Sequence, residues 1–284
     1  MFKRPLNRSW QSRDKRIVKD ILKSGEYQLE RPKEGSECTV KVQMVTQNEE
    51  QQTGGQQTGG YFQSAIVCDD FDGRVVIGEA DTEFDRAVEK VLQLMDKGEV
   101  SKVTVKLDTI DCSACAYVTL VDFTPSQSTY AWSKEKKMEV ARRYKERGCE
   151  LFKAGRILDA YLRFGRAVKL LITLGTDNET VRPLYVTLCN NMAWCQLARS
   201  QLEHALTLCN KVLEKEPDNV KALMRRAEAF TWLKDTENAV NDLTRVTELE
   251  PRNTVAHERL VTMKNRLALE TVRYNNTIKK MFRF

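Results

Sequence analysis

Four polar side chains in the C-terminal half of the chain could bind carboxylates. They are Lys145, Asn191, Lys221 and Arg225. Lys221 and Arg225 are four positions apart, so a helix would carry both on one face. Ammonium, guanidinium and amide donors that converge on two carboxylates form charge-assisted hydrogen bonds and can capture the C-terminus of a peptide. The alternative is a solvated basic face, because Lys and Arg are common exposed residues.

A second group with potential chemistry is the C-x-x-C sequence Cys112-Ser113-Ala114-Cys115. Such a pair can be redox-active or can form half of a zinc site. A second Cys or His pair close by would strengthen that interpretation, but the two histidines, His204 and His257, lie far along the chain. We therefore expect a tight turn here, with no metal and no cofactor.

Small residues define the elements that must position the four polar side chains. Two sets recur at matching offsets: Gly148, Ala193 and Ala227, and twelve positions later Ala160, Ala205 and Ala239. The last two alanines are 34 positions apart, and Pro217 and Pro251 repeat at the same spacing. This period is typical of tetratricopeptide (TPR) repeats, which are helical hairpins that stack into a solenoid. Stacking would line the four polar side chains along one groove.

The two ends of the repeat region also follow from the pattern. The sequence predicts three hairpins over residues 134–252, with Ser133 as the first N-cap and extra length around 173–181. Residues 253–284 form a capping helix with a basic tail, because the last apolar face of a solenoid must be covered. Trp194, Phe230 and Trp232 are interpreted as packing residues between helices.

Residues 1–125 read as a strand-rich domain. Cys38, Val40 and Val42 alternate with polar residues, as on a half-buried strand, and further strands are expected at 61–67, 103–107 and 117–121. The apolar positions within 84–95 have helical spacing. Two Gln-Gln-Thr-Gly-Gly copies within 49–60 predict a loop. Residues 126–133 are expected to form a linker. The fold class is therefore α+β: an antiparallel sheet with a short helix, followed by an all-α region.

Composition restricts the function classes. The chain has 284 residues, of which 41% are hydrophobic and 30% charged, so it can bury real cores. The sequence shows no secretory signal and no apolar run near the length of a membrane span. The eight cysteines fall mostly within apolar patterns, which favours a reducing, cytoplasmic location, with the nucleus as an alternative. The net charge of +6 is concentrated in the repeat half, which favours an acidic partner over nucleic acid.

The order of several motifs resembles that of the large immunophilins, which combine an FKBP-type peptidyl-prolyl isomerase domain with three TPR hairpins and a closing helix. The motifs are Lys23-Ser24-Gly25-Glu26 with Pro32, Gly35 and Val40; Met95-Asp96-Lys97-Gly98-Glu99; Trp132 with Lys145-Glu146-Arg147-Gly148; and Ile278-Lys279-Lys280-Met281-Phe282. The resemblance implies an FKBP-like domain over 1–125.

Three departures from the family indicate a degenerate isomerase domain. The family has an aromatic floor, usually Trp, seven residues before the Met of M-x-x-G-E, and Val88 stands there. The Gln-Gln-Thr-Gly-Gly repeats replace the family's Phe-Asp-Ser-Ser segment. Only Asp108 to Ala116 separate the last two strands, where the family has a long loop. The alternative is an active isomerase with a remodelled pocket.

The resemblance also implies partners. In the family, five positions form a clamp for the acidic C-terminal tail of a heat-shock chaperone, and Lys145, Asn191, Lys221 and Arg225 match four of them. Cys149 stands at the fifth, where the family has Asn or a small polar residue. The basic amphipathic tail implies calmodulin as an alternative ligand. We interpret the protein as a non-catalytic adaptor or co-chaperone for a client protein, for which a circadian protein kinase is one expectation. A scaffold that does not bind chaperones is the other class.

Overall fold

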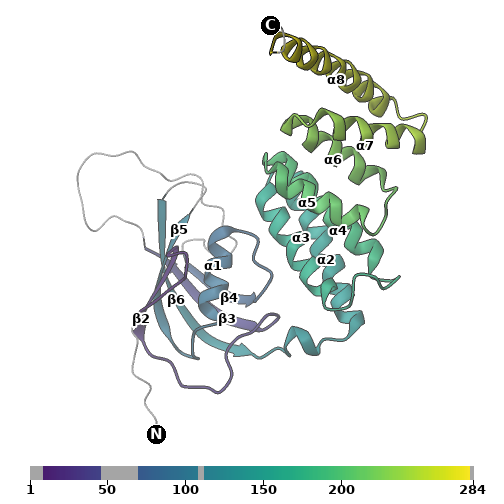
Figure 1. Ribbon diagram of the computed structural model, residues 1–284. Coiled ribbons are helices and arrows are strands. Elements are labelled where there is room, and N and C mark those ends of the chain that lie inside the picture. The colour runs from purple at the N-terminus through teal and green to yellow at the C-terminus, as the bar shows by residue number, and fades with distance from the viewer. Residues whose placement is uncertain (1–8, 46–69, 108–111, 282–284) are drawn as a thin grey trace. The chain divides into compact units, whose positions relative to one another are not determined.

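The computed structural model describes residues 9–45, 70–107 and 112–281. The chain divides into two compact units, with the boundary between Trp132 and Ser133 (Figure 1). Residues 129–131 form a short 3₁₀ helix, η1, at the end of the first unit. Trp132 is buried in the first unit, where its ring lies against Gly35.

The first unit contains a six-stranded antiparallel sheet in the order β1-β2-β5-β6-β3-β4. The strands are β1 (Ser9–Gln11), β2 (Ile17–Lys23), β3 (Glu37–Met44), β4 (Asp70–Val76), β5 (Val100–Leu107) and β6 (Cys112–Thr124). In β3, the predicted alternation is confirmed, because Cys38, Val40 and Val42 are fully buried while their neighbours are not. These side chains form one wall of the core.

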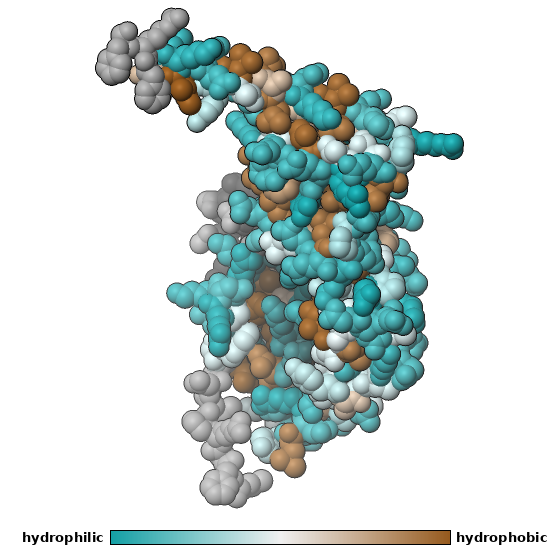
Figure 2. All heavy atoms as spheres, turned by 45° about the vertical axis from the view of Figure 1, so that its right-hand side comes forward, coloured by the Kyte–Doolittle hydropathy of each residue, from teal (hydrophilic) through white to brown (hydrophobic). Residues whose placement is uncertain are grey.

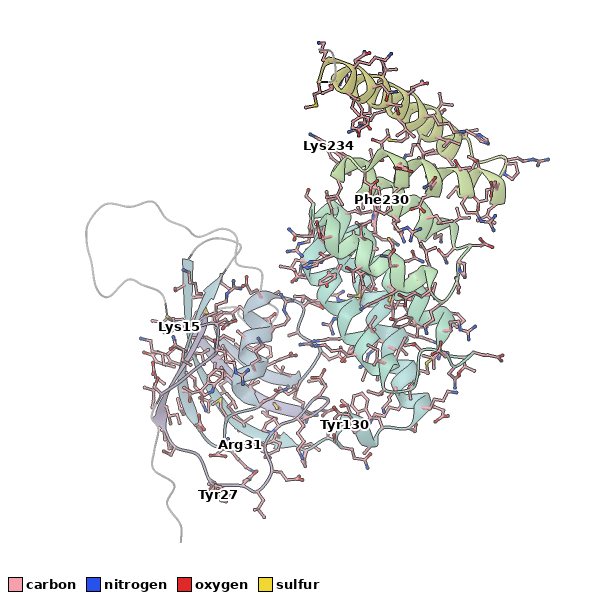
Figure 3. The ribbon with its side chains drawn as sticks, in the orientation of Figure 1. Lys15, Tyr27, Arg31, Tyr130, Phe230 and Lys234 are labelled. Atoms are coloured by element: carbon pink, nitrogen blue, oxygen red, sulfur yellow. The ribbon has the colours of Figure 1, made fainter. Side chains whose placement is uncertain are left out.

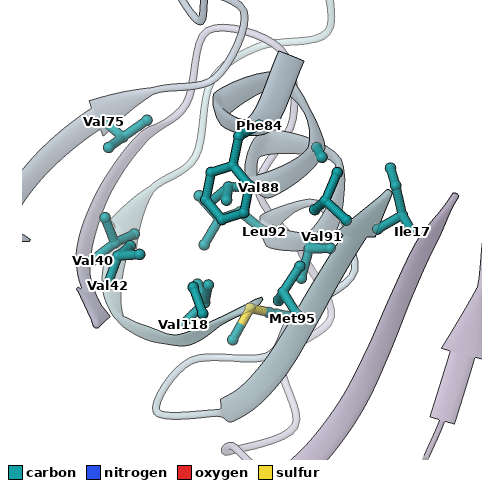
Figure 4. Close-up of a cluster of buried hydrophobic side chains, with 14 of the residues drawn as sticks. Ile17, Val40, Val42, Val75, Phe84, Val88, Val91, Leu92, Met95 and Val118 are labelled. Carbon is teal, nitrogen blue, oxygen red and sulfur yellow. The ribbon is translucent and has the colours of Figure 1, made fainter. Parts of the chain in front are cut away.

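Helix α1 (Glu83–Leu92) packs on the sheet and closes this core. It begins after Thr82, whose side chain accepts a hydrogen bond from the Asp85 backbone N–H. Phe84, Val88 and Leu92 extend from the helix toward the sheet (Figure 4). The predicted helix over 84–95 is confirmed as far as Leu92, where α1 ends. Gly98, in the turn that follows, has a φ of +77°, a conformation that glycine adopts without strain.

The prediction of a tight turn at the C-x-x-C sequence is wrong. β6 begins at Cys112, and Cys115 pairs with Thr104 of β5. The Cys115 Sγ lies 3.3 Å from the Thr104 Oγ1. The strands pair almost to their connection, so only residues 108–111, outside the described ranges, separate them rather than Asp108 to Ala116.

Other predictions for the first unit fall partly outside the described residues. The loop over 49–60 and the strand over 61–67 belong to this group. β1, β2 and β4 were not predicted from the sequence pattern. In β2, the inward positions include Lys19, which is 3% exposed, so the apolar alternation that identifies a strand is broken there.

Lys19 forms a buried ion pair that connects three segments of the first unit. Its Nζ lies 2.7 Å from the Glu99 Oε1 and donates a hydrogen bond to the Leu94 carbonyl at 3.1 Å. Glu99 also accepts hydrogen bonds from the Ser101 hydroxyl and the Asp96 backbone N–H. A buried pair whose remaining donors and acceptors are satisfied in this way avoids most of the cost of desolvation.

The second unit is all-α and confirms the predicted hairpins and terminal helix. Its helices are α2 (Lys134–Lys153), α3 (Ile157–Ile172), α4 (Arg182–Ala198), α5 (Leu202–Leu213), α6 (Val220–Leu233), α7 (Thr236–Leu249) and α8 (Thr254–Met281). α2 begins after the predicted N-cap Ser133, which accepts a hydrogen bond from the Lys136 N–H. The extra length around 173–181 is the connection between α3 and α4.

The repeating small residues lie where the two helices of a hairpin approach each other. The five alanines of the two sets are at most 1% exposed. At Gly148 the approach leaves no room for a side chain, because a Cβ atom there would overlap the ring of Phe164. The period of the sequence therefore records steric contacts within hairpins.

Helix α8 covers the last hairpin with its first turns only. Leu260 and Met263 pack against Ala227, Ala239 and Leu243. Beyond them, Leu269 and Val272 are exposed by 61% and 56%, and apolar side chains appear on the outer surface of α8 (Figure 2). The fully buried residues of α8 thus lie in about its first third, while Arg266, Leu267 and Glu270 further along are partly buried.

None of the helices in the described part of the chain is both long enough and apolar enough to span a bilayer.

Candidate functional site

Three helices of the second unit carry the predicted carboxylate-binding residues. Lys145 and Cys149 lie one turn apart on α2, Asn191 lies on α4, and Lys221 and Arg225 lie one turn apart on α6. All are at least partly accessible to solvent. Each is on the first helix of its hairpin, as the stacking argument predicted.

Asn219 fixes the start of α6 beside α4. As the N-cap, its Oδ1 accepts hydrogen bonds from the Ala222 backbone N–H at 3.0 Å and from Asn190 Nδ2 at 3.2 Å. Its Nδ2 donates to Glu216 at 2.7 Å. Lys221 and Arg225 follow in the first two turns of α6, so this network sets their position relative to Asn191.

Asn191, Lys221 and Arg225 line one groove of about 1150 Å³ between α4 and α6. The site continues toward α2, because the Asn191 Nδ2 lies 3.9 Å from the Cys149 Sγ. Lys145 is not in the groove wall, but it shares a face of α2 with Cys149, one turn away. The structure therefore places Cys149, Asn191, Lys221 and Arg225 around one site. Lys145 is connected to this site only through Cys149, one turn away on α2.

Arg225 is the most constrained cation of the groove. Its guanidinium carbon lies 5.7 Å from the ring centre of Trp194, a cation–π distance. Its Nη1 is buried and has no hydrogen-bond partner among the described residues. Burial lowers the pKa of Arg225, and nearby Cys209, Cys195 and Glu228 partly oppose this effect. A desolvated donor without a partner is favourably placed to bind an anion.

The interpretation of the aromatic residues as packing residues is wrong for two of them. Trp194 is 40% exposed and lines the groove, and Trp232 is 69% exposed. Phe230, labelled in Figure 3, is partly buried against the core formed by α6, α7 and α8. The helical phase would have identified Trp232, because it lies seven positions after Arg225 and so on the same face of α6.

Sequence reasoning also missed a charged pair at the end of the groove. Glu228 and Arg259 both line it, and the Glu228 Oε2 lies 3.2 Å from the Arg259 Nη1. Glu228 follows Arg225 by three positions, a spacing that also predicts a shared helix face. The groove thus combines three cations, Lys221, Arg225 and Arg259, with four carboxylates, Glu216, Asp218, Glu228 and Glu250. Of these, Glu228 is paired with Arg259 and Asp218 with Arg245.

The position expected for the aromatic floor of the isomerase pocket lies inside the core of the first unit. Val88 is 0% exposed and packs with Phe84, Val40, Val42 and Val118 (Figure 4). Val88 thus contributes to the core that joins α1 to the sheet.

Metal binding has no support among the residues that the structure describes, which include no group of three or more His, Cys, Asp and Glu side chains that could hold an ion.

An antiparallel sheet with one packed helix, followed by TPR hairpins with a charged groove, defines an FKBP-like protein with a TPR repeat unit. Comparison with known proteins agrees. A family model described as "BDBT FKBP like N-terminal" matches residues 10–122. The mouse protein named FK506-binding protein-like is 31% identical over 252 residues, which are 88% of this chain and 66% of the relative. The chain belongs to the immunophilin family and is a divergent member.

Other relatives agree with this assignment. The bovine protein named peptidyl-prolyl cis-trans isomerase FKBP4 is 29% identical, over 78% of this chain and 52% of the relative. The human FK506-binding protein-like is 35% identical, and the match covers 61% of this chain and 48% of that protein. The chain thus spans about half to two thirds of these relatives. The crystal structure of residues 1–211 of CG17282 has the same fold, with a TM-score of 0.57 at 22% identity over 69% of this chain and 96% of that one.

Proposed function

We propose that the protein is a non-catalytic adaptor of the co-chaperone type. Its TPR unit binds the acidic C-terminal tail of a heat-shock chaperone, and its FKBP-like unit holds a client protein. The observation that carries the proposal is the groove in which Asn191, Lys221 and Arg225 converge, with one buried guanidinium N–H of Arg225 unpartnered. A peptide carboxylate bound in the groove would pair with the guanidinium charge and offset its desolvation.

Capture of a free C-terminus explains the combination of groups better than a solvated basic face does. A surface lysine or arginine keeps its charged end in water, whereas Arg225 has a buried Nη1 and lies over an indole ring. Affinity in the micromolar range, about −8 kcal/mol, would suit such a short contact.

The non-catalytic part of the proposal rests on Val88. Prolyl isomerisation requires a pocket that stabilises the twisted amide, and a valine buried in the core supplies no aromatic surface to a substrate. An active isomerase is the competing function, favoured by the relatives that carry the isomerase name. A cis–trans assay on proline peptides separates the two: turnover that tacrolimus abolishes would contradict the adaptor function.

Calorimetric titration of an acidic chaperone C-terminal peptide tests the groove. We expect the free-acid peptide to bind the full chain and its C-terminal amide to bind at least tenfold more weakly, because the amide removes a carboxylate charge. Arg225→Ala and Lys221→Ala should each reduce binding of the free acid by a similar factor. Lys264→Ala, an exposed substitution on α8 away from the groove, is the control. Equal binding by wild type and Arg225→Ala would contradict the proposal.

Other expectations from the resemblance stay predictions. They are a protein kinase as the client, calmodulin as a ligand of the basic tail, and a cytoplasmic or nuclear location. Affinity capture from cytosol, followed by identification of the bound proteins, tests the first two.

A further inference from the structure

Two cysteines lie where the first and second hairpins of the repeat unit meet. Cys149 is on α2 and Cys195 is on α4, and the two helices contact each other. The Cys149 Sγ lies 3.9 Å from the Asn191 Nδ2. Asn191 and Cys195 are four positions apart, so they share one face of α4. The Cys149 thiol therefore lies against the face of α4 that also carries Cys195.

The electrostatic environment of Cys195 also places the two thiols close together. Burial raises the pKa of Cys195 to about 12, and the neighbouring Cys149 adds to this effect, since two thiolates repel each other. Arg225 acts on Cys195 in the opposite direction, because its guanidinium favours the thiolate. The two sulfur atoms and this cation form a cluster in which binding of a carboxylate by the groove requires only the cation.

The two thiols differ in their access to solvent. Cys149 is partly exposed and can meet a solute, whereas Cys195 is 0% exposed. Both are free thiols. Redox-sensing cysteines often have this arrangement, in which an accessible thiol reacts first and a second thiol beside it resolves the product. The partly exposed Cys115 lies on β6 in the first unit and offers a comparison.

We propose that Cys149 and Cys195 form a site of reversible oxidation by peroxide, which joins α2 to α4 through a disulfide. The inference goes beyond the proposed function, because neither thiol needs a peptide in the groove in order to react. A disulfide of this kind is transient in a reducing compartment, since cellular thiols reduce it again.

The reaction consumes two thiols and one molecule of hydrogen peroxide. The Cys149 thiolate attacks one peroxide oxygen, the O–O bond breaks, and the hydroxide that leaves takes up the thiol proton as water, so that Cys149 becomes a sulfenic acid. The Cys195 sulfur then attacks the Cys149 sulfur. The S–S bond forms as the S–O bond breaks, and the Cys195 proton leaves with the hydroxide as a second water. The pair loses two electrons, which reduce the peroxide.

The disulfide would change the groove at its α2 end. It holds the two Cβ atoms about 3.5–4.5 Å apart, so the Cys149 sulfur is fixed at Cys195 and leaves the Asn191 amide. Lys145, one turn before Cys149, moves with α2. Oxidation should therefore weaken binding of a free-acid peptide. This consequence rests on the proposed function, whereas formation of the disulfide does not.

Mass spectrometry of the full chain tests the pair. The reduced protein is treated with a small excess of hydrogen peroxide, the remaining thiols are blocked, and a digest is analysed without reduction. We expect a cross-link between the peptides that contain Cys149 and Cys195, and its loss after treatment with dithiothreitol. Cys115→Ser, the matched control, should give the same cross-link. In Cys195→Ser, dimedone should instead trap Cys149 as a sulfenic acid.

Calorimetric titration tests the effect on the groove. Oxidised wild type should bind an acidic free-acid peptide without methionine about threefold or more weakly than reduced wild type, as expected for one lost hydrogen bond. Dithiothreitol should restore the affinity, which separates the disulfide from oxidation of Met224 in the groove, because a methionine sulfoxide needs a dedicated reductase. Peroxide treatment should not change the affinity of Cys149→Ser.

The outcomes separate the two proposals. In peroxide-treated wild type, an oxidised Cys149 together with a free Cys195 thiol would overturn the pair, and so would a cross-link from Cys149 to any other cysteine. A Cys149–Cys195 cross-link that leaves the peptide affinity unchanged would overturn the coupling to the groove. If reduced wild type binds no free acid better than its amide, the proposed function fails, while the cross-link still tests the pair.

Discussion

Cys149 lies beside the groove, at the position where the resemblance to the large immunophilins implies Asn or a small polar residue. Its Sγ lies 3.9 Å from the Asn191 Nδ2, a long contact, and a thiol is a weak donor and a weak acceptor. An amide at this position would offer two strong donors and one acceptor. We therefore expect the thiol to weaken the proposed site, and a single substitution tests this.

Cys149→Asn should tighten binding of a free-acid chaperone peptide by about three- to tenfold, since one added hydrogen bond contributes about 0.5–1.5 kcal/mol. Calorimetric titration measures the change. Cys149→Ala is the matched control, because it removes the thiol without adding donors. Weaker binding by the asparagine variant than by the alanine variant would show that this position does not face the ligand.

The cysteines around the groove should differ in reactivity. Cys149 is partly exposed, whereas Cys195 and Cys209 are fully buried, and burial raises the pKa of both to about 12. Maleimide at about pH 8 should label Cys149 first, since the thiolate is the reactive form. Bound peptide should slow this labelling. Mass spectrometry of digests locates the label, and labelling of Cys195 as fast as that of Cys149 would contradict the described burial.

The same two thiols give a pH dependence of stability. Their pKa is raised in the folded state, so at alkaline pH the unfolded chain releases these protons first. The free energy of unfolding should therefore fall as the pH rises above about 9. Urea unfolding at several pH values measures the slope. The double variant Cys195→Ala/Cys209→Ala lacks both thiols, so its free energy of unfolding should fall less with pH. An equal fall would show that other residues cause the pH dependence.

The approach of α2 and α3 depends on Gly148. Gly148→Ala should lower the free energy of unfolding by about 1–3 kcal/mol, because the added Cβ overlaps the ring of Phe164 and forces the helices to shift. Gly165→Ala in α3 is the matched control. A Cβ there meets only Met192, at 3.8 Å, so better helix propensity should raise stability by up to about 1 kcal/mol. Urea unfolding measures the free energy of unfolding of both variants. Equal changes in the two would refute the steric explanation.

Helix α8 is predicted to stabilise the repeats only through its first turns. Leu260→Ala should cost about 2–4 kcal/mol, since this side chain is 7% exposed and packs on the last hairpin. Leu269→Ala, at a position that is 61% exposed, should change stability by less than about 0.5 kcal/mol. Thermal unfolding compares the two variants. A large loss from Leu269→Ala would mean that the second half of α8 is covered in solution.

On the scale of the whole chain, the distribution of charge should control binding. The net charge of +6 comes from the repeat unit, and exposed charges are screened by salt. Raising the salt from about 0.05 to 0.5 M should weaken binding of the free-acid peptide several-fold. Calorimetry at several salt concentrations measures the change, and a salt-independent affinity would contradict capture of the free acid by Lys221 and Arg225.

The sequence predicted the parts of the fold in which close packing restricts residue size or apolar residues recur at a regular spacing. The TPR hairpins were found because the approach of Gly148, Ala160 and their equivalents admits only small residues. β1 and β2 were missed because β1 has three exposed residues and β2 carries a buried lysine. The donors Asn191, Lys221 and Arg225 were located by type and spacing. Trp194 and Trp232 were misassigned, because hydrophobicity alone does not show whether a residue faces a neighbouring helix or a groove.

The buried pair of Lys19 and Glu99 limits how this protein can change over evolutionary time. Loss of either partner alone leaves an uncompensated buried charge, at a cost of about 3–5 kcal/mol. Substitution of both by apolar residues of similar volume can be neutral, so in related sequences the two positions should vary together. The pair joins β2 to the residue before β5. It therefore holds the sheet together independently of core positions on α1 such as Val88.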